Sequence, residues 1–156
     1  MRKMLVISAV AVLLSSAVVL AYTYHPPHGG VLVKLGPRVA FLEFIYDEGE
    51  GSLLAYSLDE NAETRLLLDQ NQIVVRITPN SGAASFILPL KALEDRYTGE
   101  TPGNTSTFKG QSDQLKDLPG FSGVVVSVNS KGRNFRDVPF QFPKKWSLSY
   151  GIDTSN

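Results

Sequence analysis

From Val31 onward, apolar residues occur in short stretches separated by glycine, proline, asparagine and aspartate, and no helical period is sustained. Stretches of this length and punctuation predict β-strands. Three pairs of stretches flank short turns and therefore predict β-hairpins: 38–46 with 52–58, 72–78 with 84–91, and 123–129 with 133–142. The stretch 31–35 predicts one more strand, and 64–68 is a further candidate.

About seven to eight short strands with regular turns favour an antiparallel β-sandwich of immunoglobulin-like kind over a lipocalin-like barrel. Pro139 cannot donate to a strand ladder, so it predicts an edge strand or a bulge. The polar stretch 98–112 predicts a surface loop or crossover. After it, Ser112 has the character of a helix N-cap, which predicts a short helix over 112–118.

The first segment has the pattern of an export signal. Arg2 and Lys3 precede Leu5–Ala21, an uncharged and mainly apolar run. Val19 and Ala21 occupy the positions that small residues take before a cleavage site. The run also reaches the lower length limit for spanning a hydrocarbon layer of about 30 Å, so a retained membrane anchor is the alternative. In both cases the positive charges at the start predict that residues 22–156 lie outside the cytoplasm, as a periplasmic, secreted or cell-envelope protein.

We therefore expect a signal peptide or anchor over 1–21, a linker over 22–30, a β-sandwich domain over 31–143 and a tail over 144–156. The 156 residues are 43% hydrophobic and 19% charged, which is typical of one folded domain. The 15 basic and 15 acidic side chains balance, which argues against nucleic-acid binding. Lys144 and Lys145 are too few for a lipid-binding patch, so membrane contact is expected only through residues 1–21 if they are uncleaved.

Candidate chemistry is confined to two histidines, His25 and His28, in the sequence His-Pro-Pro-His-Gly-Gly. Imidazole is a common ligand of Cu(II) and Zn(II), and a proline-stiffened segment could present two of them together. The alternative is a linker whose histidines are solvated or pack on the domain. The chain has no cysteine, which excludes a disulfide, a thiol nucleophile and a cysteine zinc site.

No residue pattern predicts an enzyme. No Gly-x-Ser-x-Gly sequence is present, and a Ser-His-Asp site would need the histidine segment to fold onto the domain. The acidic turn at Asp47, Glu48 and Glu50 lacks the ligand spacing of a calcium loop, so we interpret it as a solvated hairpin tip. We therefore predict no catalytic and no cofactor-binding residues.

Several short motifs resemble a known group of proteins. They are Pro27-His28-Gly29-Gly30, Phe41-Leu42-Glu43-Phe44, Leu54-Ala55-Tyr56-Ser57-Leu58-Asp59, Thr98-Gly99-Glu100-Thr101 and Val138-Pro139-Phe140. The chain resembles, over residues 27–142, uncharacterised small exported bacterial proteins whose mature chain opens with Pro-His-Gly-Gly. It is distantly similar to the N-terminal regions of periplasmic adaptor subunits of heavy-metal efflux pumps. Members of the group often carry a lipidated cysteine or more histidines near the N-terminus, and this chain has neither.

The pattern as a whole predicts an exported, non-enzymatic β-sandwich that binds a partner protein in the cell envelope. The alternative hypothesis is a weak transition-metal-binding or metal-delivery protein that uses His25 and His28.

Overall fold

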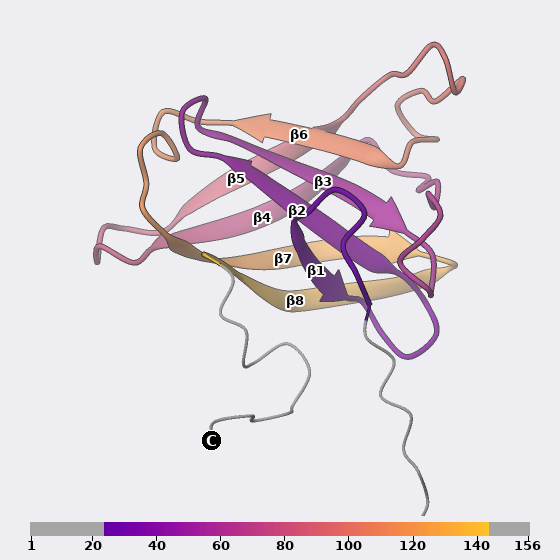
Figure 1. Cartoon of the computed structure of the whole chain (residues 1–156), viewed down its shortest axis with the longest axis horizontal. Helices are drawn as coiled ribbons and strands as arrows, with labels where there is room; N and C mark the ends of the chain where they lie inside the picture. Colours follow the sequence, from indigo (N-terminus) through magenta and orange to yellow (C-terminus); the bar gives the residue numbers. More distant parts are fainter. Residues whose placement is uncertain (1–23, 144–156) are drawn as a thin grey trace, which may run out of the picture.

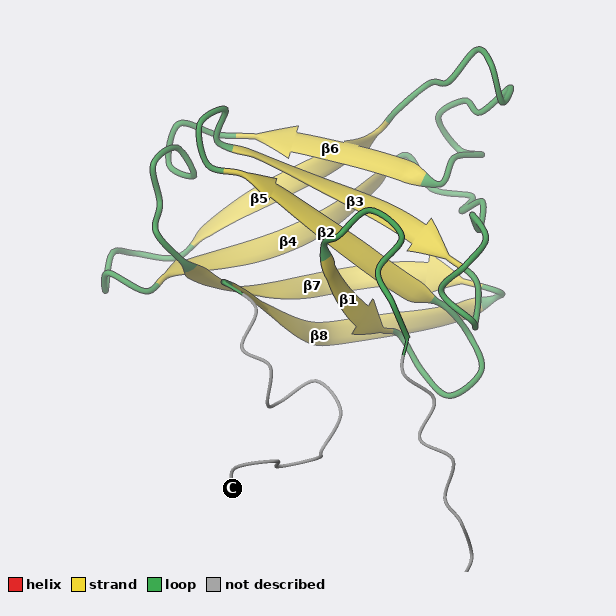
Figure 2. Ribbon diagram, viewed as in Figure 1, coloured by secondary structure: helices red, strands yellow, loops and turns green. Residues whose placement is uncertain are grey.

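A computed structural model describes residues 24–143, which form an all-β domain of eight strands (Figure 1). The strands are β1 (Val31–Lys34), β2 (Phe41–Asp47), β3 (Ser52–Leu58), β4 (Gln72–Pro79), β5 (Phe86–Ala92), β6 (Thr107–Gln111), β7 (Phe121–Ser130) and β8 (Arg133–Phe142). Every strand pair is antiparallel. Strands and loops account for all of the described residues (Figure 2). The predicted all-β antiparallel class is confirmed.

The strands form one continuous sheet in the order β1-β2-β3-β6-β5-β4-β7-β8. This sheet curls until its two edge strands, β1 and β8, approach each other, so its shape is nearly that of a barrel (Figure 1). An immunoglobulin-like sandwich would divide into two separately bonded sheets. Here β6 pairs with β3 on one side and with β5 on the other, and this pairing joins the two halves. The join to β5 is short, with only Lys91 and Ala92 in register with Lys109 and Phe108.

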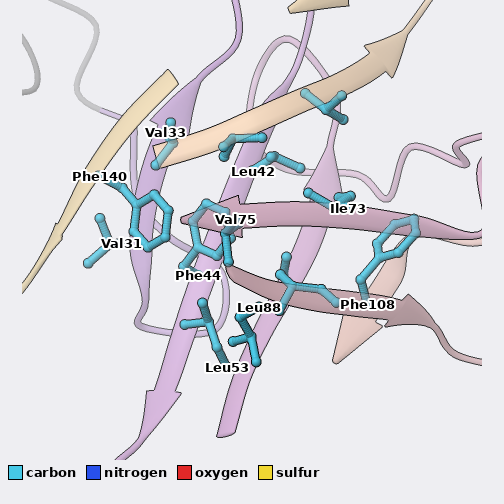
Figure 3. Packing of buried hydrophobic residues seen from close by; sticks show 14 of the residues in the cluster. Val31, Val33, Leu42, Phe44, Leu53, Ile73, Val75, Leu88, Phe108 and Phe140 are labelled. Carbon is cyan, nitrogen blue, oxygen red and sulfur yellow. The ribbon is translucent and has the colours of Figure 1, made fainter. Parts of the chain in front are cut away.

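The core fills the interior of the curled sheet. In β4, Ile73, Val75 and Ile77 alternate with more exposed residues and are completely buried. Such alternation is what a strand with one buried face requires. Side chains from β1, β2, β5, β6 and β8 meet them (Figure 3). The rings of Phe44 and Phe140 stack with centroids 4.1 Å apart, which packs β2 against the edge strand β8.

The three predicted hairpins are confirmed as β2–β3, β4–β5 and β7–β8. Pro139 lies in β8, the last strand in the sheet order, as its missing N–H predicted.

Three local predictions are wrong. The polar stretch 98–112 contains the strand β6, because Phe108 enters the core. Residues 112–118 form tight turns in place of a helix, although Ser112 Oγ does accept a bond from the Gln114 amide at 3.2 Å. Leu68 makes only an isolated bridge to Thr105, so 64–68 is not a strand.

The predicted signal peptide or anchor over 1–21 and the predicted tail over 144–156 lie outside the described residues. Within 24–143, no helix is long and apolar enough to cross a membrane.

Candidate functional site

The segment Tyr24–Gly30 packs on the outer face of the sheet. In β2, Leu42 and Phe44 point into the core, so Phe41 and Glu43 point to the opposite face. Phe41 belongs to a second, smaller apolar cluster on that face, and Tyr24 packs against it with ring centroids 4.7 Å apart. Leu32, Leu58 and Ala62 complete this cluster. The histidine segment is therefore attached to the domain from Tyr24 onward.

Glu43 is a charged side chain with no solvent exposure, and the segment supplies its hydrogen bonds. The amides of His28 and Gly30 donate to Oε1 at 2.9 and 2.8 Å. Nδ1 of His28 lies 2.7 Å from Oε2. In the tautomer with its proton on Nδ1, the imidazole donates to this carboxylate oxygen. Burial of a carboxylate is costly without such partners, so this clasp between His28 and Glu43 compensates for it.

The His28 ring is also held from one side by an aromatic ring. Tyr56 of β3 lies directly opposite Glu43 in the register. Its ring stacks on the imidazole with centroids 4.0 Å apart and planes 13° apart. The His28 side chain keeps about a third of its surface exposed. Its position is fixed by Glu43 and Tyr56, and Nε2 is the ring nitrogen that the clasp leaves available.

A histidine oriented by a carboxylate through Nδ1 can do two things through Nε2. It can bind a metal ion, since metal-binding histidines usually donate their other N–H to a carboxylate or carbonyl. It can also act as a general base toward a neighbouring hydroxyl. Among residues 24–143, Glu43 is the only side chain hydrogen-bonded to His28, so no serine or threonine nucleophile is paired with it.

His25, the other predicted ligand, lies in a different environment. It lines an open depression of about 600 Å³ together with Tyr24, Lys34, Arg38, Glu60, Asn61 and Glu63. Within the part of the chain that the structure describes, no three His, Asp or Glu side chains come together to hold a metal ion. A metal bound by His25 and His28 would therefore have few protein ligands.

Sequence reasoning missed Glu43 and a second buried carboxylate, Glu100. Glu100 accepts bonds from the Ser106 amide at 2.9 Å and from the hydroxyls of Ser106 and Thr105, each at 3.0 Å. Burial alone would raise the pKa of Glu100. The hydrogen bonds and the nearby Arg65 guanidinium outweigh it, and the pKa lies below its ordinary value. The only sequence signal for Glu43 was an acid in an otherwise apolar strand.

Contacts around Glu100 hold the loop 93–106 against the loop 59–71 at one end of the sheet. Leu68 and Thr105 exchange backbone hydrogen bonds of 2.9 and 3.3 Å, and Arg65 lies 3.5 Å from Glu100 and 3.7 Å from Asp95. We call residues 59–71 and 93–106 the braced loop surface. Residues 93–106 protrude beyond β5 and β6 (Figure 1).

The braced loop surface carries most of the exposed apolar side chains. Of the four large hydrophobic residues that are exposed in residues 24–143, three lie on it: Leu67, Leu93 and Tyr97. Tyr97 is fully exposed, yet its amide donates to Asp95 Oδ1 at 2.9 Å, so the backbone that carries it is held in place.

Comparisons of the chain with protein-family models, with curated proteins and with solved structures give no match.

Proposed function

We propose that this protein is an exported, non-enzymatic binding module of the cell envelope that contacts a partner protein through the braced loop surface. The observation that carries the proposal is Tyr97, a fully exposed aromatic side chain on a backbone fixed by Asp95 and Glu100. Tyrosine is a frequent anchor in protein interfaces.

The bracing lowers the entropy cost of binding. A mobile loop must be ordered when it meets its partner, and this ordering reduces the affinity. Here Asp95 and Glu100 exchange two backbone hydrogen bonds of 3.0 Å, and Thr101 and Asn104 exchange two more of 3.1 and 2.8 Å. These bonds fix the loop before any partner arrives. Tyrosine adds contact area with few rotatable bonds, which makes it suited to a preformed loop.

Location outside the cytoplasm is supported by the sequence. Arg2 and Lys3 before the apolar run Leu5–Ala21 are typical of an export signal or anchor, and the resemblance to small exported bacterial proteins agrees with it. Binding through loops at one end of a β-domain is also how immunoglobulin-like modules work. We propose the likeness to such modules for this mode of binding, with the two halves of the sheet joined through β6.

Photo-crosslinking in intact cells tests the proposal. A photoreactive phenylalanine analogue replaces Tyr97, and a matched variant carries it at Ser81, an exposed residue in the turn between β4 and β5. That turn lies at the opposite end of the sheet (Figure 1). We expect a discrete crosslinked protein from position 97 and none from position 81. Equal crosslinking from both positions, or none from position 97, would contradict the proposal.

A second candidate function is weak binding of Cu(II) or Zn(II) at His28, with His25 as an additional ligand. The observation in its favour is the 2.7 Å contact of Nδ1 with the Glu43 carboxylate, which leaves Nε2 as the ligand atom. Calorimetric titration of the full chain with each metal tests it. Loss of binding in His28→Ala, with a smaller loss in His25→Ala, would support this function. Identical binding in both variants and the wild type would exclude it.

A further inference from the structure

The open depression beside His25 is lined by both cationic and anionic side chains. The cationic side chains are those of Lys34, the last residue of β1, and Arg38, in the connection between β1 and β2. Glu60 and Glu63 provide carboxylates from the turn that follows β3. The depression measures about 600 Å³, which is enough for a small molecule. None of these residues takes part in the clasp between His28 and Glu43 or in the braced contacts of Glu100.

The two cationic groups lack carboxylate partners. Among residues 24–143, neither Lys34 nor Arg38 forms a salt bridge, although Glu60 and Glu63 line the same depression. Lys34 instead places Nζ over the rings of Tyr24 and Phe41, 5.5 and 5.8 Å from their centroids. Cation–π contacts of this kind hold an ammonium group in position without neutralising it. Its charge stays available to an anion.

Arg38 is held in a backbone conformation that arginine disfavours. Its φ is 53°, in the left-handed region where a side chain costs roughly 1–2 kcal/mol. Glycine would relieve this strain, but glycine would also remove the guanidinium from the depression. Strained residues of this kind are concentrated at binding sites.

Of the two carboxylates, Glu60 is already in an ion pair and Glu63 is not. Glu60 Oε2 lies 3.7 Å from Nζ of Lys131, in the turn between β7 and β8. The Glu63 side chain forms no salt bridge within residues 24–143. The depression is therefore lined by two available cations and one available carboxylate, together with Tyr24.

We propose that this depression binds a small zwitterionic molecule, with its oxyanion group against Lys34 and Arg38 and its ammonium group against Glu63. The oxyanion is a carboxylate or a phosphate, and both match the guanidinium of Arg38. The depression shares Glu60 and Glu63 with the braced loop surface, but Leu67, Leu93 and Tyr97 do not line it, so either proposal can fail without the other.

Calorimetric titration of the full chain in a non-ionic detergent tests the proposal. The probes are β-alanine and phosphoethanolamine, which carry the same ammonium group with a carboxylate or a phosphate. Inorganic phosphate supplies an oxyanion without an ammonium group, and ethylamine supplies an ammonium group without an oxyanion. We expect saturable binding of at least one zwitterion, with a Kd of about 1 mM, because an open and solvated site supports only modest affinity. The zwitterion with the lower Kd shows whether the site prefers a carboxylate or a phosphate. We expect each single-charge probe to bind at least about tenfold more weakly.

Three variants locate the binding. Lys34→Gln and Arg38→Gly should each weaken it about tenfold, and Arg38→Gly should do so without unfolding the domain, because glycine adopts the backbone angle of Arg38 freely. Lys91→Gln removes the same charge from the exposed side chain of Lys91 on β5 and should leave binding unchanged. The proposal is overturned if neither zwitterion binds, if Lys91→Gln weakens binding as much as Lys34→Gln, or if inorganic phosphate binds as tightly as the zwitterions.

Discussion

The carboxylate of Glu43 and the imidazole of His28 lie 2.7 Å apart although fifteen residues separate them in the chain. This contact, with the two amide bonds to the same carboxylate, attaches the histidine segment to the outer face of β2. It also orients His28 for any chemistry at Nε2.

The first prediction concerns this clasp. Glu43→Ala removes the acceptor of three hydrogen bonds in a site without solvent exposure. We expect the free energy of unfolding to fall by about 1–3 kcal/mol, because partly buried donors are left without partners. Urea unfolding measures the loss, and hydrogen exchange at the Gly30 amide should accelerate more than exchange within β4. Glu94→Ala, at an exposed side chain, serves as the control and should change little.

The second prediction concerns the packing between β7 and β8. A Cβ atom at Gly123 would clash with the ring of Phe140, which stacks on Phe44. Gly123→Ala should therefore destabilise the domain by about 1–3 kcal/mol through overpacking. Adding Phe140→Leu should recover part of this loss, although Phe140→Leu alone destabilises. Purely additive losses in the double variant would show that the ring is not the obstacle.

The third prediction concerns pH and Glu100. Hydrogen bonds outweigh the effect of burial and keep the pKa of Glu100 below its ordinary value in the folded protein. A lowered folded-state pKa contributes stability above the unfolded-state pKa of about 4.3, and this contribution disappears as the pH falls through the folded-state value. Glu100→Gln should therefore be less stable than the wild type at pH 7. The gap between their unfolding free energies should narrow below about pH 4. A gap that stays constant from pH 7 to pH 3 would contradict the assignment.

The fourth prediction concerns the turn between β7 and β8. Lys131 and Gly132 have φ values of 48° and 70°, which is the conformation of a type I′ hairpin turn. Asparagine tolerates positive φ better than lysine, so Lys131→Asn should raise the free energy of unfolding by roughly 0.5 kcal/mol. The melting temperature should rise with it. The lost contact with Glu60, at 3.7 Å between exposed side chains, costs little. Lys131→Val, with a β-branched residue, should lower the melting temperature.

The fifth prediction separates stability from binding at Tyr97. Its side chain is fully exposed, so Tyr97→Ala should change the free energy of unfolding by no more than about 0.5 kcal/mol. Crosslinking at position 97 first identifies the partner. A photoreactive residue at position 67 then measures how much of that partner is captured with Tyr97 intact and in Tyr97→Ala. If the braced loop surface binds the partner, Tyr97→Ala should reduce the amount captured. Undiminished recovery would show that Tyr97 is not an anchor.

Most strands could be predicted because their signals are local. The alternation in β4 and the turn residues between β7 and β8 show which face is buried and where the chain reverses. The strand β6 was missed because its sequence, Thr-Phe-Lys-Gly-Gln, has a single large apolar residue. It is a strand because β3 and β5 flank it and Phe108 fills the core. Tertiary packing therefore overrode a weak local propensity.

The all-β class, the three hairpins and the edge position of Pro139 follow from local patterns, namely period-two burial, turn chemistry and a missing N–H. Contacts between distant parts of the chain are what join the two halves through β6 into one curled sheet and bury Glu43 and Glu100. The same holds for the different contacts of the two histidines, since His25 lines the depression and His28 contacts Glu43. A carboxylate's environment depends on donors that are distant in the chain, and no local pattern encodes them.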